Sequence, residues 1–229
     1  ASMRLSVRLL IMLLGAALIA APPAFASRVS LTPTTLLGEP TTKAHAVTLF
    51  NPDDLPVSYQ VKAYRWTQQD GKDQLVETSD VLAAPSIVEL PPKGRRVVRV
   101  IRVSGHGAVG YYRVIFQQLP KPRSETGTGA NVSLLVNHSI PLGFEAAQPD
   151  VRLTASLSPD GSGYRLTNTG TTAARVTTIG PSSGQSWREG ALGWVLPGLS
   201  KDIPLKPEHR ASALTLTVNG QSVTLTVTP

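Results

Sequence analysis

Residues 131–144 read NVSLLVNHSIPLGF, and this stretch decides the class of fold. Val132, Leu134, Val136 and Ile140 fall on one side of a two-residue period. Such alternation is typical of a half-buried β-strand, although a strand of this length is long for a small sandwich. The apolar row therefore has two interpretations. It fills the core of its own domain, or its upper part pairs with another chain.

The rest of the chain has the same character. Runs in which Val, Thr and Leu alternate are broken by Pro, Gly, Asn and Asp at a spacing typical of β-sandwiches, about 8–12 residues. This pattern predicts an all-β protein with two immunoglobulin-like β-sandwich domains. The expected strands are Arg28–Thr32, Ala44–Asn51, Val57–Thr67, Ile87–Leu90, Arg96–Val103, Gly110–Leu119 and Asn131–Phe144, then Val151–Ser158, Tyr164–Thr167, Ala174–Ile179, Gly193–Leu196 and Lys201–Leu205.

The sequence also marks a domain boundary and a closing hairpin. Glu145–Asp150 reads as a short hinge, which predicts an N-terminal domain over 27–146 and a C-terminal domain over 147–229. Near the C-terminus, two alternating apolar runs flank Asn219-Gly220. This dipeptide favours a two-residue type I′ turn.

The first 26 residues are expected to be a cloning remnant followed by a secretory signal peptide. Residues 1–2 precede a methionine, Arg4 and Arg8 form a basic start, 9–21 are apolar, and 24–26 (AFA) resemble a cleavage site. The alternative is an uncleaved membrane anchor. We expect cleavage, and no stable membrane insertion after it.

Composition excludes several classes of function. The chain has no cysteine, so disulfides and thiolate chemistry are absent. The formal charge falls from +7 to +5 once Arg4 and Arg8 leave with the signal, and the remaining positive charges are mostly dispersed. With few aromatic residues as well, nucleic-acid binding is not expected.

No catalytic or metal-binding motif is visible. The histidines stand far apart and show no metal-ligand spacing. Glycine-rich stretches with serine lie between expected strands and match neither a nucleophile elbow nor a phosphate loop. We therefore expect no enzyme, no cofactor and no metal. The four histidines are His45, His106, His138 and His209.

A basic segment, GRRVVRVIR at 94–102, allows two interpretations. Strand geometry places Arg95 and Arg99 on one face and Arg96 and Arg102 on the other. The segment is either an edge strand that long basic side chains protect from pairing, or a strand from which one arginine binds a partner's carboxylate.

The order of motifs resembles the PapD-like periplasmic pilus chaperones of the chaperone–usher pathway. The resemblance rests on APSIVELPPKG at 84–94, YYRVIFQQLP at 111–120 and the alternating strand at 131–144. GYRLTN at 163–168 and WVLPG at 194–198 fit the same family more loosely. It implies a periplasmic protein with two immunoglobulin-like domains in a boomerang or L shape.

The resemblance also implies a mechanism and partners. A pilus subunit is an immunoglobulin-like domain that lacks its last strand, and the chaperone supplies a strand until another subunit replaces it. The implied donor residues here are Val132, Leu134 and Val136. The implied partners are pilus subunits and an outer-membrane usher, with no nucleic acid and no covalent chemistry.

The family's charged anchor is missing at its usual positions. Its better-known members hold the subunit's terminal carboxylate with a basic residue in the first strand and another late in the donor strand. The corresponding residues here are Thr35 and Pro141, a departure that resembles the divergent, archaic branch. The candidate anchors are therefore Arg99, Arg102 and His138.

Two other functions remain open from the sequence. One is a secreted immunoglobulin-like binding module, such as an adhesin or a cell-envelope carbohydrate binder. The other is a periplasmic metal-handling protein. The sequence specifies neither the subunit that would be bound nor the target of the fibre.

Overall fold

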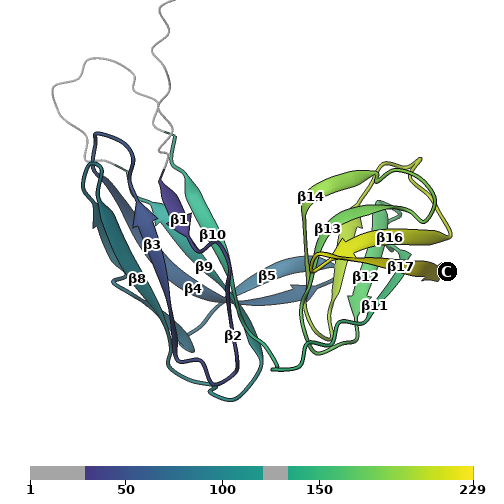
Figure 1. Cartoon of the computed structure of the whole chain (residues 1–229), viewed down its shortest axis with the longest axis horizontal. Coiled ribbons are helices and arrows are strands. Elements are labelled where there is room, and N and C mark those ends of the chain that lie inside the picture. Colours follow the sequence, from purple (N-terminus) through teal and green to yellow (C-terminus); the bar gives the residue numbers. More distant parts are fainter. Residues whose placement is uncertain (1–28, 121–133, 229) are drawn as a thin grey trace, which may run out of the picture.

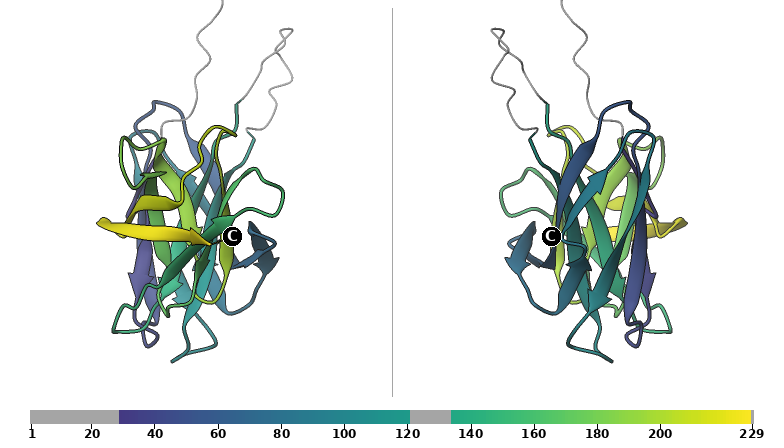
Figure 2. Two further views of the ribbon diagram at one scale, coloured as in Figure 1. Left: turned by 90° about the vertical axis from the view of Figure 1, so that its right-hand side faces the viewer. Right: turned by 90° about the vertical axis from the view of Figure 1, so that its left-hand side faces the viewer.

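The computed structural model describes residues 29–120 and 134–228, in which all regular secondary structure is β-strand. The expected signal peptide and Val132 lie outside these ranges. No helix in the described ranges is long and apolar enough to cross a membrane. Figure 1 shows two β domains side by side, joined at one end in an L. In Figure 2 the same domains lie one behind the other. The prediction of an all-β protein with two domains is confirmed.

The N-terminal domain consists of two sheets. The four-stranded sheet has the order β1-β3-β8-β6, and the six-stranded sheet has the order β2-β10-β9-β4-β5, with β7 paired to β4. The strands are β1 (Ser30–Thr32), β2 (Leu36–Gly38), β3 (Ala44–Phe50), β4 (Val57–Gln69), β5 (Lys72–Glu77), β6 (Val81–Ala84), β7 (Ile87–Leu90), β8 (Arg95–Arg102), β9 (Gly110–Gln118) and β10 (Asn137–Phe144).

A single apolar core lies in this domain, and it follows from strand alternation. Tyr59 and Val61 on β4 pack into it with Val114 and Phe116 from β9. Because successive side chains point to opposite faces of a sheet, the intervening residues of β4 and β9 face outward. Those outward residues matter for the site described below.

The basic segment forms β8, whose two faces differ as predicted. Val98, Val100 and Arg102 are buried, whereas Val97 and Arg99 are exposed. β8 lies between β3 and β6, so the edge-strand interpretation is wrong. The alternation alone could not reveal which strands flank β8.

The strand expected over 131–144 is shorter in the structure. β10 begins at Asn137, and residues 134–136 are not in a strand. β9, its antiparallel partner, ends at Gln118. Close beyond it, Pro120 has no N–H to donate to a continued ladder.

The C-terminal domain is a single seven-stranded sheet that folds around a second core. Its order is β14-β13-β16-β17-β11-β12-β15. The closing hairpin is confirmed: Val218 pairs with Gln221, and both Asn219 and Gly220 have positive φ, as a type I′ turn requires. The strands are β11 (Leu153–Leu157), β12 (Gly163–Asn168), β13 (Ala174–Pro181), β14 (Arg188–Val195), β15 (Ser200–Pro204), β16 (Ala213–Val218) and β17 (Gln221–Thr228).

Three strands were not predicted, and β14 begins earlier than expected. β2 (LLG) and β6 (VLAA) are short and contain no polar side chain, so neither shows an alternation of apolar and polar residues. All six residues of β5 are exposed, so its sequence, KDQLVE, carries no apolar alternation. The first four residues of β14 are also exposed and show no apolar alternation, so the sequence did not indicate where this strand begins.

Adjacent valines on β8 give a test of its two faces. Val98 is fully buried and Val97 is half exposed. We expect Val98→Ala to lower the free energy of unfolding by about 2 kcal/mol, because it removes buried methyl groups and leaves a cavity. Val97→Ala should change it by less than about 0.5 kcal/mol. Urea denaturation measures both, and equal losses would contradict the assigned faces.

Candidate functional site

β10 is paired along one edge over its whole length and along the other edge only at its end. β9 pairs with every residue from Asn137 to Phe144. On the other side, β2 pairs only with Leu142, Gly143 and Phe144. Among the described residues, nothing pairs with the edge of residues 137–141, and unpaired edges of this kind add strands from other chains.

The apolar row runs from Ile140 on β10 back to residues that precede the strand, and it leaves the core on the way. Ile140 is 3% exposed and belongs to the core, whereas Leu134 is 61% exposed. Val136 is intermediate, and its N–H donates to Gln118 Oε1 at 2.9 Å. The row thus continues beyond the domain that it helps to fill. Val132, the third expected donor, lies outside the described residues.

A cleft of about 490 Å³ lies between the two domains, close to the end of the open edge. Thr35 and Pro141 both line it. These are the two uncharged residues that correspond to the basic anchor positions of the better-known family members. Arg113 lines it as well and lies directly opposite Pro141 in the β9–β10 ladder. The structure therefore places a positive charge one strand away from the position at which the sequence lacks one.

Arg113 is held by stacking. Its guanidinium lies 3.8 Å from the ring centroid of Trp66, on the outward face of β4. In the described part of the chain it has no hydrogen bond or ion pair, so its planar donors are available to a ligand. Burial lowers the pKa of Arg113 from its usual value, but an arginine remains charged at neutral pH.

The opposite wall of the cleft comes from the second domain. Arg175 on β13 and Trp194 on β14 line it and are cross-strand partners. Among the described residues, the lining contains two arginines and no acidic side chain. Such a cleft favours an anion, and a carboxylate matches the fork of a guanidinium.

Sequence reasoning missed Arg113 and Arg175. The only available signal was the outward position that Arg113 shares with Tyr111 on β9, opposite the inward Tyr112 and Val114. That signal does not reveal a cleft, because the second wall belongs to a separate domain.

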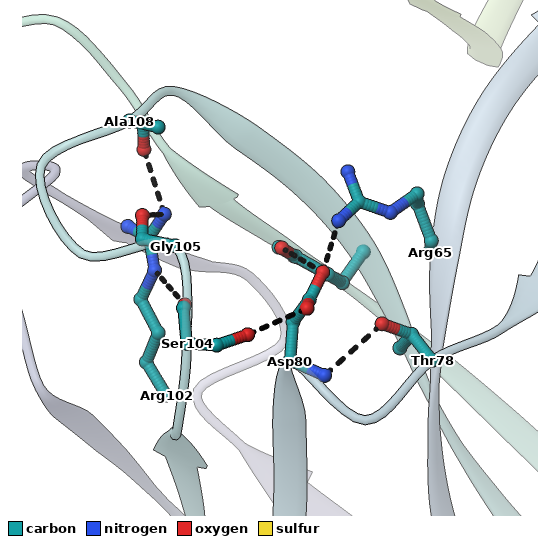
Figure 3. A network of polar contacts seen from close by, with 8 residues as sticks. Arg65, Thr78, Asp80, Arg102, Ser104, Gly105 and Ala108 are labelled. Atoms are coloured by element: carbon teal, nitrogen blue, oxygen red, sulfur yellow. Dashed lines mark hydrogen bonds and ion pairs between the residues drawn. The ribbon is translucent and has the colours of Figure 1, made fainter.

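Arg102, a predicted anchor, is a buried structural residue. Its guanidinium donates to the carbonyl oxygens of Ser104 (3.2 Å), Pro40 (3.0 Å), Ala108 (2.8 Å) and Gly105. Figure 3 shows the contacts to residues 104, 105 and 108. The side chain is 3% exposed. All three of its nitrogens are engaged by backbone, which leaves little to hold a ligand.

The other two predicted anchors also lie away from the cleft. Arg99 is exposed on the four-stranded sheet, beside Lys43 and His106. His138 lies on β10, where burial lowers its pKa and favours the neutral imidazole. The structure does not bring Arg99, Arg102 and His138 together, and their role as anchors stays a prediction.

The described residues give no support to a metal site. No group of three or more His, Asp or Glu side chains within them is placed to hold a metal ion.

Comparison with known proteins identifies the family. The model of the pili and flagellar-assembly chaperone family, PapD N-terminal domain, matches residues 28–147, more than half of the chain. The chain belongs to this family of pilus chaperones. No curated protein sequence matches the chaperone.

Solved structures share the fold across both domains of the chaperone. CsuC, in its complex with CsuE from the archaic Csu pili of Acinetobacter baumannii, is 20% identical, with a TM-score of 0.72 over 89% of this chain and 100% of that one. SafB, in complex with the Salmonella enterica SafA pilin, is 16% identical, with a TM-score of 0.65 over 90% and 98%. DraB of E. coli is 16% identical, with a TM-score of 0.62 over 89% and 97%.

Two arginines on β8 test which of them supports the fold. Replacing Arg102 with Met leaves several loop carbonyls without their donor, so we expect the free energy of unfolding to fall by about 2–3 kcal/mol. Arg99→Met on the exposed face should change it by less than about 0.5 kcal/mol. Thermal and urea unfolding measure both, and an undiminished stability in the Arg102 variant would refute this assignment.

Proposed function

We propose that this protein is a periplasmic chaperone that binds pilus subunits by donor-strand complementation and delivers them to an outer-membrane usher. The observation that carries the proposal is the half-open edge of β10, along which an apolar row leaves the domain's own core. Family membership supports the same function. The chaperone performs no covalent chemistry and needs no cofactor.

Donor-strand complementation uses two separable interactions. The open backbone edge of residues 137–141, extended by residues 134–136 in the complex, forms ladder hydrogen bonds with the subunit, and these depend little on side-chain identity. Val132, Leu134 and Val136 enter the subunit's groove and set the register. Each fully buried side chain contributes about 1.5–3 kcal/mol, enough for three positions to control the affinity.

The cleft binds the subunit's terminal carboxylate. Arg113 supplies the fork from β9, and Arg175 adds positive charge from the second domain. These arginines replace the basic pair of the better-known members, whose positions Thr35 and Pro141 occupy without charge. This departure supports assignment to the archaic type.

Neighbouring leucines test donation by β10. Leu134 belongs to the two-residue period of the row and Leu135 does not, and both are exposed. We expect Leu134→Asp to abolish recovery of a 1:1 complex with a co-expressed pilus subunit, because a carboxylate would enter an apolar groove. Circular dichroism should show an intact fold.

Leu135→Asp is the matched control and should leave complex recovery largely unchanged. If Leu134→Asp binds the subunit as well as wild type, donation by this row is excluded.

Arg113 tests the anchor. We expect Arg113→Ala to weaken binding of a peptide with the subunit's C-terminal sequence by about 10–100-fold, through loss of charged hydrogen bonds. Arg113→Lys should retain part of the affinity, and Arg99→Ala all of it. Calorimetry with free-acid and amidated peptides isolates the carboxylate: equal affinity of wild type for both would contradict the anchor.

A further inference from the structure

The β4–β5 hairpin extends from the N-terminal domain toward the second one. Figure 1 shows β5 reaching across to the C-terminal domain. Its turn, Asp70-Gly71, has positive φ at both residues, as in a tight hairpin. All six residues of β5 are exposed in the whole chain, so the hairpin adds little to the N-terminal core.

The tip of the hairpin is fitted to β15. Asp202 N–H donates to Gly71 C=O at 2.8 Å. A Cβ on Gly71 would collide with the Asp202 carboxylate, which Arg165 holds by two hydrogen bonds of 2.7 and 2.9 Å. Only glycine allows this approach, so the contact is specific.

Close to the tip, the side chain of Gln68 forms hydrogen bonds with the backbone of the second domain. Its amide donates to Trp194 C=O at 2.6 Å and accepts from Leu196 N–H at 3.0 Å, and the side chain is 6% exposed. Removing it would leave the part-buried Trp194 carbonyl and the buried Leu196 N–H without these partners, which destabilises the contact between the domains.

An ion pair closes the hairpin side of the contact. Lys201 Nζ on β15 lies 2.5 Å from Asp73 Oδ2 on β5, and Gln68 donates to the other oxygen of Asp73 at 2.9 Å. Burial alone would raise the pKa of Asp73, but the hydrogen bonds from Lys201 and Gln68 outweigh it and hold this pKa below its usual value.

Two further contacts join the domains beside the hairpin. Trp66 and Tyr111 face away from the N-terminal core and are buried against Ala173 and Leu196 of the second domain. Tyr111 Oη accepts from Ala173 N–H at 3.0 Å and donates to Glu145 Oε1 at 3.0 Å. Contacts at the hairpin tip, the sheet face and the hinge fix the relative orientation of two bodies.

We propose that the β4–β5 hairpin sets the width of the interdomain cleft, and that Gln68 and Lys201 are positioning residues for Arg113 and Arg175. One arginine comes from each domain, so their spacing depends on the domain angle. Trp66, on which Arg113 stacks, also packs against Trp194 at 5.9 Å between centroids. This role rests on the proposed function of the cleft as a carboxylate site.

The first test measures the domain angle without any ligand. The chain has no cysteine, so Val97→Cys and Ser222→Cys, both at exposed positions, allow one spin label on each domain of the full chain. Pulsed electron–electron double resonance should give one narrow distance distribution in the labelled chain with no other substitution. We expect a broad or shifted distribution in Gln68→Ala, and an unchanged one in Gln60→Ala, an exposed residue of the same strand.

Lys201 gives a second and milder test should Gln68→Ala fail to fold. We expect Lys201→Met to broaden the distribution and Lys201→Arg to restore it, because arginine keeps the charge facing Asp73. Distributions identical to wild type in both Gln68→Ala and Lys201→Met would overturn the proposal.

The second test links the angle to the cleft. Both disruptive variants should bind the free-acid subunit peptide at least about fivefold more weakly, the low end of coupling between sites, with Lys201→Arg restoring the affinity. A broadened distribution with unchanged affinity would refute the positioning role. An unaltered affinity in Arg113→Ala would instead remove the carboxylate site itself, while the distance measurements would still report the hairpin's effect on the domain angle.

Discussion

The half-paired backbone of β10 is the constraint on which the rest of the structure depends. At its C-terminal end the strand lies between β9 and β2, and its side chains fill the core of the N-terminal domain. The ladder with β2 does not continue to residues before Leu142. The next residue in that direction, Pro141, has no N–H to donate. One strand therefore serves its own domain at one end and offers a template at the other.

This division gives the cleft its importance. An open strand edge can pair with another strand in more than one register, because a shift by two residues keeps every side chain on the same face. A charge held at a fixed position at the end of the edge removes this ambiguity. In the proposed function Arg113 meets that need from β9, because Trp66 supports it and no acidic side chain is among the described residues that line the cleft.

The sequence was sufficient for features that depend on local periodicity and turn chemistry. The alternation in β8 placed its two faces correctly, and Asn219-Gly220 predicted the closing hairpin. It was insufficient where partners decide the structure. β8 is internal only because β6, four residues long, flanks it, and β5 forms without any apolar pattern because it pairs with β4 and contacts the second domain.

The site divides along the same line. The proposed donor row is a periodic pattern within residues 131–144, so the sequence alone can suggest it. The cleft could not, because it joins Arg113, Pro141 and Arg175 from different strands and domains. Arg102 illustrates the converse. Its basic neighbours suggested a ligand, whereas its burial and four backbone carbonyls show a structural residue, a distinction that sequence spacing does not carry.

Amide hydrogen exchange along β10 tests the central claim most directly. The chaperone should be compared alone and in its 1:1 complex with a pilus subunit, with β16 and β17 as an internal reference. Pairing of the open edge predicts slower exchange at the outward-facing amides of residues 134–140 in the complex and no change in the reference strands. Equal exchange of these amides in both states would contradict the account.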